Sequence, residues 1–270
     1  MQAQANMAVA AAPAAAESLP GEPVAALHLE DVKKRFGRLS VLESVSLTVP
    51  AGERRGILGP NGAGKTTLFN LITGELPLSG GTIRFFGQDI GPLSVHRRAS
   101  LGLCRTFQTT TLFPKLTAVE NVIVALQSQT RARLQILRPR SWNRDLEARA
   151  RELLTQAGLA AQSDREVRYL SHGEQRQIEI LLAVAQKPRV LLLDEPTAGL
   201  APGDVPLVTN MLKQLGRDVT IVLIEHDMSV VFELVDRITV LHYGRAIAEG
   251  TVEEIRRNAL VQEIYLGGKL

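Results

Sequence analysis

The chain has one cysteine, Cys104, and few aromatic residues, which make up 4% of its 270 positions. A single cysteine excludes a disulfide framework and any metal site built from several cysteines. Long apolar runs are absent too. The uninterrupted apolar segments at 180–185 and 190–193 fall far short of the about 20 residues that a membrane-spanning helix requires. If the chain works at a membrane, other subunits must cross it.

Charge of one sign is not in large excess. The 31 Lys and Arg against 28 Asp and Glu give a formal net charge of +3. That is far from the clustered basic excess of a dedicated nucleic-acid-binding domain. Apolar residues make up 45% and charged residues 22%, a balance typical of a folded globular chain. The length accommodates one large domain or two small ones.

The first 26 residues contain no Lys or Arg and are rich in Ala and Pro. They lack the positive start and the compact apolar block of a secretory signal. We therefore expect residues 1–26 to form a disordered extension of a cytosolic chain. The lone cysteine agrees with a reducing compartment.

From residue 27 onward, strand-like and helix-like patterns alternate. Alternating or continuous apolar runs predict strands at 27–32, 45–49, 55–58, 82–86, 190–193 and 219–224. The last two are almost wholly apolar, which is typical of strands buried on both faces of a parallel sheet. Apolar residues at helical spacing predict helices at 66–72, 119–126, 146–154 and 205–215.

The middle of the chain, from about residue 91 to 167, is rich in Arg and has no convincing strand beyond 102–107. We expect it to form a helical lobe inserted into an α/β core, with 127–144 as a surface excursion. The core as a whole is expected to span 27–250, followed by a tail at 251–270. We find no repeat with a period of 20–50 residues.

A glycine-rich loop lies between an expected strand and an expected helix. Residues 59–66 fit G-x-x-x-x-G-K-[ST] at every fixed position. Backbone amides in such a loop point at phosphate oxygens, and the following helix adds its positive N-terminal end. We expect Lys65 to reach the β- and γ-phosphates of ATP and the Thr66 hydroxyl to ligate Mg²⁺. The expected nucleotide-binding residues are Gly59, Pro60, Asn61, Gly62, Ala63, Gly64, Lys65, Thr66 and, near the α-phosphate, Thr67.

Two carboxylates, Asp194 and Glu195, follow the apolar run at 190–193. Ligands of open α/β sheets bind at the carboxyl ends of the strands. We therefore expect Asp194 to hold Mg²⁺ through water. Glu195 is placed one residue further on, where it can polarise the attacking water as a general base.

At this point the chain resembles the nucleotide-binding subunit of an ATP-binding-cassette (ABC) transporter, over roughly residues 27–268. Further segments resemble family motifs in the same order: Arg-Phe-Gly at 35–37, Arg-Thr-Phe-Gln at 105–108, Leu-Ser-His-Gly-Glu at 170–174 and Ile-Glu-His-Asp at 224–227. The resemblance implies that Phe36 stacks on adenine. It implies that Gln108 senses the γ-phosphate and Mg²⁺, and that His226 contacts the γ-phosphate or the attacking water. Ser171 and Gly173 would bind the γ-phosphate of an ATP held by the opposite subunit.

The resemblance also implies an α/β fold and a set of partners. The fold is that of a P-loop NTPase: a mixed, RecA-like β-sheet core, an antiparallel β subdomain and an inserted α-helical subdomain. A motif that acts across a subunit boundary implies a second ATP-binding subunit, identical or a sibling, in a head-to-tail pair. Two transmembrane permease subunits, docked around residues 108–121, and an extracytoplasmic solute-binding protein complete the assembly. The chain would lie peripherally on the cytoplasmic face of the inner membrane, with no nucleic-acid partner.

Two positions depart from the commoner family pattern. His172 stands where glycine is usual, and Ala201 stands where aspartate is often found; the second bears on how two ATP sites communicate. Segments at 105–122, 175–180 and 249–267 resemble importers of branched-chain amino acids. Amide or urea importers and lipopolysaccharide-type exporters share this framework. A soluble ABC ATPase acting on DNA or ribosomes, or a P-loop kinase, is the alternative from another class.

Overall fold

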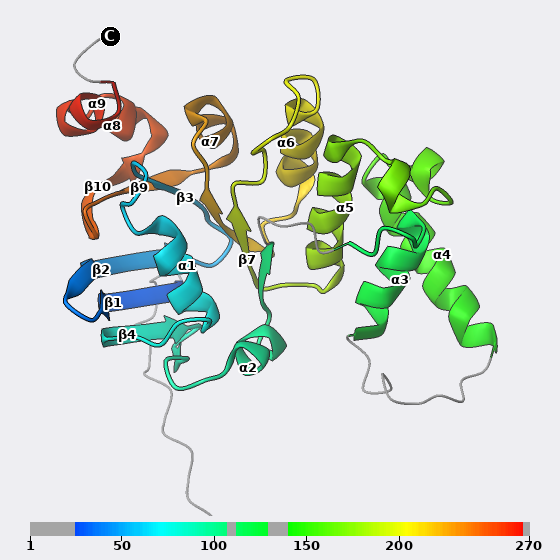
Figure 1. Ribbon diagram of the computed structural model, residues 1–270, viewed down its shortest axis with the longest axis horizontal. Helices are drawn as coiled ribbons and strands as arrows, with labels where there is room; N and C mark the ends of the chain where they lie inside the picture. Colours follow the sequence, from blue (N-terminus) through cyan, green and yellow to red (C-terminus); the bar gives the residue numbers. More distant parts are fainter. Residues whose placement is uncertain (1–24, 107–111, 129–139, 267–270) are drawn as a thin grey trace, which may run out of the picture.

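The computed structural model describes residues 25–106, 112–128 and 140–266 (Figure 1). Ten strands in these ranges form one sheet. They are β1 (Ala25–Phe36), β2 (Leu39–Pro50), β3 (Arg54–Leu58), β4 (Gly80–Phe85), β5 (Gln88–Asp89), β6 (Leu103–Thr106), β7 (Val190–Asp194), β8 (Thr220–Ile224), β9 (Arg237–His242) and β10 (Arg245–Thr251). Their order across the sheet is β5-β4-β1-β2-β10-β9-β3-β8-β7-β6.

The helices connect these strands and flank the sheet (Figure 1). They are α1 (Lys65–Thr73), α2 (Val95–Ser100), α3 (Ala118–Ser128), α4 (Arg140–Gln156), α5 (His172–Ala185), α6 (Val205–Gln214), α7 (Met228–Leu234), α8 (Val252–Arg256) and α9 (Ala259–Leu266). Two short 3₁₀ helices, Ala160–Gln162 and Val167–Tyr169, lie between α4 and α5.

The parallel part of the sheet is buried on both faces. Strands β6, β7, β8, β3 and β9 run parallel to one another, and every residue of β3, β7 and β8 is buried. Side chains alternate between two core clusters because successive residues of a strand point to opposite faces. Leu191 and Leu193 pack with residues of α3, α5 and α6, whereas Val190 and Leu192 pack on the opposite side with residues of α1.

An antiparallel part of the sheet continues beyond β10. Strand β1 pairs with β2 and β4, and a single parallel bridge, Arg245 to Ser44, joins β2 to β10. Helix α1 lies beside these strands in Figure 1, and its Leu68 and Leu71 share a core cluster with Leu27 and Leu42. The mixed sheet, its antiparallel extension and the separate helices α3 and α4 confirm the expected α/β fold class.

Two expected boundaries differ from the structure. Strand β6 pairs with β7 inside the core sheet, and α2 packs against α1 and β6. The helical lobe, made of α3, α4 and the part of α5 that contacts them, therefore begins after residue 106 and not at about 91. At the other end, Ala26 is fully buried and Ala25 pairs with Pro50. The expected extension at 1–26 thus overlaps β1 by two residues, because these residues extend the hairpin into the core.

Within the described ranges, none of the helices combines the length and apolar content needed to span a bilayer.

Candidate nucleotide-binding and hydrolysis site

The glycine-rich loop connects the end of β3 to the first turn of α1. A Cβ on Gly59 would stand 2.4 Å from the Leu241 carbonyl oxygen, and one on Gly64 would stand 2.5 Å from Leu42 Cδ2. Gly64 also has a φ of +102°, a region that strains residues with a side chain. Gly64 is the N-cap of α1, and no side chain caps that end. The amide groups of the first turn therefore face the loop, as a phosphate-binding loop requires.

Lys65 lies folded back onto the loop. Its Nζ donates to the carbonyl oxygens of Gly59 at 2.6 Å and of Pro60 at 3.1 Å. The residue is only 6% exposed. Burial lowers the pKa of the Lys65 ammonium, and the nearby carboxylates of Glu195 and Asp194 oppose that shift. The ammonium thus already lies inside the loop, held by neutral acceptors that phosphate oxygens can replace.

The other loop residues vary in exposure. Asn61, Gly62 and Thr66 are exposed, Ala63 is buried and Thr67 is half-buried. The Thr66 hydroxyl, one residue after the lysine, is therefore accessible to a ligand. Ala63 has an internal role, because its carbonyl oxygen accepts a hydrogen bond from the Gly244 amide at 3.1 Å.

Phe36 lies at the tip of the β1–β2 hairpin, where it pairs with Leu39. The residue is 46% exposed, and Lys34 Nζ lies 4.9 Å from the centre of its ring. An exposed aromatic ring on a hairpin tip is available to stack on a planar ligand.

Asp194 ends β7 and is fully buried. Its Oδ2 accepts a hydrogen bond from Arg105 at 2.6 Å, and a second nitrogen of Arg105 donates to Asn70 Oδ1 at 2.6 Å. These contacts tie β7 and β6 to α1. Asp194 Oδ1, in contrast, has no hydrogen-bond partner among the described residues.

A buried carboxylate oxygen without a donor needs an explanation, such as an ion or water. In the described ranges, no group of three or more His, Cys, Asp and Glu gathers around one point. Mg²⁺ is commonly bound by one or two protein oxygens together with waters and substrate phosphates. The free oxygen of Asp194 and the accessible hydroxyl of Thr66 fit that kind of site.

Glu195 and His226 meet at the ends of neighbouring parallel strands. Each follows closely on its strand, β7 or β8, and His226 Nε2 lies 2.8 Å from Glu195 Oε1. The side chain of Glu195 is 23% exposed and that of His226 is 46% exposed. Glu195 has a φ of +48°, a left-handed conformation that costs free energy in a residue with a side chain and persists only where the surroundings impose it.

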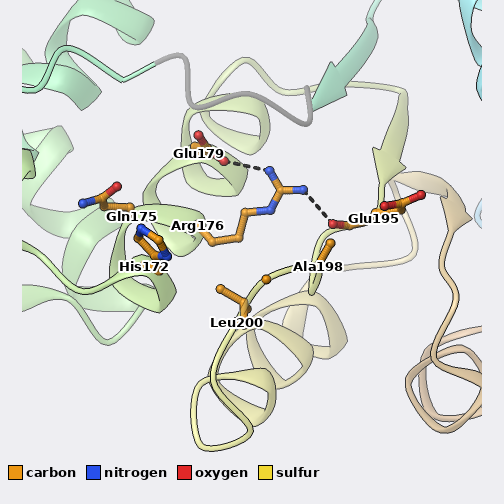
Figure 2. A pocket seen from close by; sticks show the side chains of 8 residues that line it. His172, Gln175, Arg176, Glu179, Glu195, Ala198 and Leu200 are labelled. Atoms are coloured by element: carbon orange, nitrogen blue, oxygen red, sulfur yellow. Dashed lines mark hydrogen bonds and ion pairs between the residues drawn. The ribbon is translucent and has the colours of Figure 1, made fainter.

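A guanidinium from α5 holds the loop that carries Glu195 (Figure 2). Arg176 donates to three consecutive carbonyl oxygens, those of Asp194 at 3.1 Å, Glu195 at 3.1 Å and Pro196 at 2.9 Å. It also pairs with Glu179 at 2.7 Å. These bonds impose the backbone conformation at Glu195.

A cavity of about 380 Å³ lies beside this loop (Figure 2). Glu195, Arg176 and the exposed His172 line it together with Ala198 and other residues of both elements. His172, which departs from the family pattern, therefore lies on the wall of the same cavity as Glu195.

Ser171 and Gly173 lie at the start of α5. Ser171 is the N-cap: its Oγ accepts from the Glu174 amide at 3.2 Å, and Glu174 accepts from the Ser171 amide at 2.8 Å. A Cβ on Gly173 would stand 2.6 Å from Asp204 Cγ. In the described part of the chain, the hydrogen bonds of Ser171 stay within α5 and do not reach the 59–64 loop. The structure therefore gathers Lys65, Asp194, Glu195 and His226, but not Ser171, at one place.

Gln108, the remaining expected site residue, lies outside the described residues. Two residues further along the expected docking segment, Glu120 and Asn121, serve the lobe itself. Asn121 is buried, and its amide group donates to the carbonyl oxygens of Phe113 and Thr117, at 3.2 and 2.9 Å. Glu120 accepts from the Thr117 amide at 2.7 Å at the start of α3. In the described part of this expected docking segment, the large apolar side chain of Phe113 is exposed.

Sequence reasoning missed three residues that organise the site: Arg105, Arg176 and Glu225. Each occurs inside a recognised motif, but no role was assigned to it. The sequence feature that could have found them is a charged residue beside or within an apolar segment that is expected to be buried. Such a residue needs a buried partner, but the partner itself cannot be read from spacing.

Together, this fold and site define a P-loop nucleotide hydrolase with a separate helical lobe. Residues 42–198 match the family model described as ABC transporter. A protein of Pseudomonas aeruginosa, the "High-affinity branched-chain amino acid transport ATP-binding protein BraF", is 38% identical over 248 residues, covering 89% of this chain and 97% of the relative. The chain belongs to the ABC transporter family. It is an ATPase of the kind that is coupled to transport, as expected.

Further similarities agree with this assignment. LivG of Escherichia coli K12, named as another high-affinity branched-chain amino acid transport ATP-binding protein, is also 38% identical, with the same coverage. A solved structure titled as the ADP conformation of an ATP-binding cassette of an ABC transporter has a TM-score of 0.79 at 30% identity, covering 90% of this chain and 99% of that chain. Residues 247–269 match a second model, described as Branched-chain amino acid ATP-binding cassette transporter.

Proposed function

We propose that this chain hydrolyses ATP to drive import of branched-chain amino acids, as one of two ATP-binding subunits arranged head to tail. The observation that carries the hydrolytic part is the contact of Glu195 with His226 beside Lys65 and Asp194. The tail match at 247–269 and the names of BraF and LivG support the cargo. The lipopolysaccharide export protein LptB of Acidithiobacillus ferridurans is less similar, at 32% identity.

The loop residues bind the triphosphate. Lys65 Nζ exchanges the carbonyl oxygens of Gly59 and Pro60 for phosphate oxygens, which are stronger acceptors because they are charged. The free amide groups at the start of α1 add to this binding, together with Pro60, Asn61, Gly62, Ala63, Gly64 and Thr67. Phe36 stacks on the adenine, contributing about 1 kcal/mol with little discrimination between bases.

Thr66, Asp194 and Gln108 would hold Mg²⁺, which when bound neutralises charge on the phosphates. Within the chain, Arg105 fixes Asp194 by one carboxylate oxygen and leaves the other available. The residue that presents the metal-facing oxygen is therefore oriented before any ligand arrives.

Glu195 takes a proton from the attacking water as a general base. A carboxylate in that role must lie within hydrogen-bond reach of the water, and its partial exposure allows this. His226, in contact with the same carboxylate oxygen, orients it and hydrogen-bonds to the γ-phosphate. The three carbonyl contacts of Arg176 keep Glu195 in place.

Ser171 and Gly173 act on the nucleotide of the other subunit. Their position at the N-terminus of α5, without a hydrogen bond from Ser171 to its own phosphate loop in the described residues, supports this arrangement. The N-terminus of a fourteen-residue helix attracts an anion. ATP then joins two surfaces, and hydrolysis releases them, as in a ligand-biased two-state switch.

The remaining subunits are two transmembrane permeases and an extracytoplasmic solute-binding protein, with this chain bound at the cytoplasmic face of the inner membrane. Phe113, within the expected docking segment, is exposed and thus available for a permease contact. The permeases and the solute-binding protein select the solute, so the cargo cannot be recognised by this chain alone.

Glu195→Gln tests the hydrolytic proposal. The amide keeps the shape but cannot accept a proton, so turnover should fall by about 100-fold or more, while ATP affinity persists. The ATP-bound variant should elute as a dimer in size-exclusion chromatography. Glu152→Gln, the same change at an exposed position on α4, serves as the control and should behave as the parent. Parent-like turnover by Glu195→Gln would show that the base lies elsewhere.

The cargo requires the whole assembly. We expect leucine, isoleucine or valine to stimulate ATPase activity of the transporter reconstituted in vesicles with its solute-binding protein. Stimulation by urea or short amides alone would favour the amide importer, and activity without any solute-binding protein would favour an exporter.

A further inference from the structure

Glu225 is a buried carboxylate that the proposed chemistry does not use. It follows the last residue of β8 and precedes His226, and it is only 3% exposed. Burying a carboxylate costs free energy unless its oxygens find donors. In the part of the chain that the structure describes, no cation pairs with it, so neutral donors must stabilise it.

Three hydrogen bonds supply that stabilisation. Glu225 Oε1 accepts from the Thr197 amide at 2.7 Å and from the Thr197 hydroxyl at 2.6 Å. Its Oε2 accepts from the His226 amide at 3.1 Å. The two oxygens therefore hold two different segments, that of His226 and that of Thr197, which lies 28 residues before Glu225 in the sequence.

These contacts close a ring around the candidate hydrolytic pair. Thr197 lies two residues after Glu195 on one loop, and His226 begins the other. The two side chains meet at 2.8 Å, and the Glu195 amide donates to the Ile224 carbonyl oxygen at 2.9 Å. Because Glu195 and His226 are themselves partly exposed, packing alone does not set their separation. The carboxylate of Glu225 joins the two backbones through its hydrogen bonds to Thr197 and His226.

A glutamine at position 225 would have nearly the same shape but could not make the same bonds. It has one acceptor oxygen and one NH₂ group. Its NH₂ group would then face a backbone N–H donor, either that of Thr197 or that of His226. The ionised carboxylate is thus needed because it presents two acceptor oxygens, whereas glutamine presents only one.

We propose that Glu225 is a positioning residue for ATP hydrolysis. Its carboxylate holds the loop of Glu195 and the backbone of His226 in the register at which the two side chains act on the same water and γ-phosphate. This inference rests on the proposed function. It adds a residue that contacts neither nucleotide nor water and acts through Glu195 and His226.

The test compares turnover with nucleotide binding in the Glu225→Gln variant. Because a misplacement near 1 Å can cost about 100-fold in rate, kcat should fall by about 10- to 100-fold. Affinity for ATP should stay within about twofold of the parent, since the lost interaction acts on the reaction and not on ground-state binding. ATP affinity is measured with a fluorescent ATP analogue, and kcat from phosphate release.

Asp236→Asn is the matched control. Asp236 also accepts a backbone amide, that of Arg54 at 2.8 Å, but at the opposite end of β3 from the phosphate loop. It should lose stability and keep kcat. If Asp236→Asn lowers kcat as much as Glu225→Gln does, the effect reflects stability alone and the proposal is wrong.

Thr197→Val carries the test if Glu225→Gln does not fold. It removes only the hydroxyl bond, so a smaller loss of kcat, about 3- to 10-fold, is expected with unchanged ATP affinity. Parent-like kcat in a folded Glu225→Gln, or in Thr197→Val where the former is insoluble, overturns the inference. A parent chain that neither binds nor hydrolyses ATP would instead refute the proposed function.

Discussion

Single residues in this protein carry both chemistry and restraint. Lys65 Nζ donates to two carbonyl oxygens of its own loop. Arg105 binds one carboxylate oxygen of Asp194 and leaves the other available. Arg176 and Glu225 both hold the backbone around Glu195. Arg176 donates to backbone carbonyl oxygens, and Glu225 accepts from backbone amide groups. The side chains of Glu195 and His226 thus remain partly exposed.

Lys65→Ala tests the phosphate role of the lysine. Removing a charged donor to phosphate should weaken ATP binding by about 1.5–3 kcal/mol, or roughly 10- to 100-fold in Kd. Isothermal titration calorimetry with ATP measures this directly. Lys213→Ala, on the distant helix α6, is the control and should bind as the parent. An unchanged Kd for Lys65→Ala would contradict the assignment.

The positions of many site residues could be predicted from the sequence, because the phosphate loop is a local pattern. The loop at 59–66 and the carboxylates at 194 and 195 were located by spacing, and their roles stay predictions. The partners Arg105, Arg176 and Glu225 were not found. Arg105 and Asp194 lie 89 residues apart, and nothing in either neighbourhood specifies the other.

At the scale of elements, one helix end illustrates how buried arginines replace missing hydrogen bonds. The last carbonyl groups of an α-helix have no partner within the helix. Arg98 of α2 donates to two of them in α1, those of Leu71 at 2.6 Å and Ile72 at 2.8 Å. Gly74 allows this approach, since a Cβ there would stand 2.8 Å from Arg98 Nε.

Arg98→Met should therefore destabilise the fold. It removes the side-chain hydrogen bonds to the carbonyl oxygens of Leu71 and Ile72, at a cost of about 2–3 kcal/mol in the free energy of unfolding. Urea denaturation followed by circular dichroism provides the measurement. The neighbouring, exposed Arg97→Met should change stability by less than about 0.5 kcal/mol. Equal midpoints for the two variants would refute the capping role.

The elements most faithful to their sequence pattern are β7 and β8, whose continuous apolar runs predicted strands buried on both faces. The least faithful is the start of the helical lobe. The residues of helix α2 and strand β6 fall in the expected lobe because the whole segment from about 91 to 167 is rich in Arg and has little strand pattern. Their membership of the core depends on the pairing of β6 with β7, a contact distant in sequence.

At the scale of the whole molecule, a charged cluster at the end of the sheet away from the phosphate loop joins β3, the α6–β8 loop and the start of β9. Asp236, just before β9, accepts from the Arg54 amide and pairs with Arg217 of the α6–β8 loop. Burial raises the pKa of the Asp236 carboxyl, but the hydrogen bonds from Arg217 and Arg54 outweigh it. The pKa therefore lies below its ordinary value of 3.8.

This lowered pKa predicts acid sensitivity of the fold. The unfolded chain takes up the proton at higher pH than the folded one, so the stabilisation exists above about pH 4 and is lost as pH falls through the folded pKa. Asp236→Asn should cost about 1 kcal/mol near pH 7, since the pair is partly exposed, and progressively less as pH falls through the lowered pKa of the folded state. Urea unfolding at several pH values measures the difference. A cost that does not change with pH would contradict this account.

The sequence by itself determined the nucleotide-binding class, the buried parallel strands and the family, because each depends on residues within a few positions of one another. A glycine-rich loop bends, and a continuous apolar run is buried, wherever the rest of the chain lies. Only the tertiary structure decided which arginine holds Asp194, that Arg176 and Glu225 restrain the loop of Glu195, and where the lobe begins. Those contacts join distant segments whose meeting depends on the packing of the whole sheet.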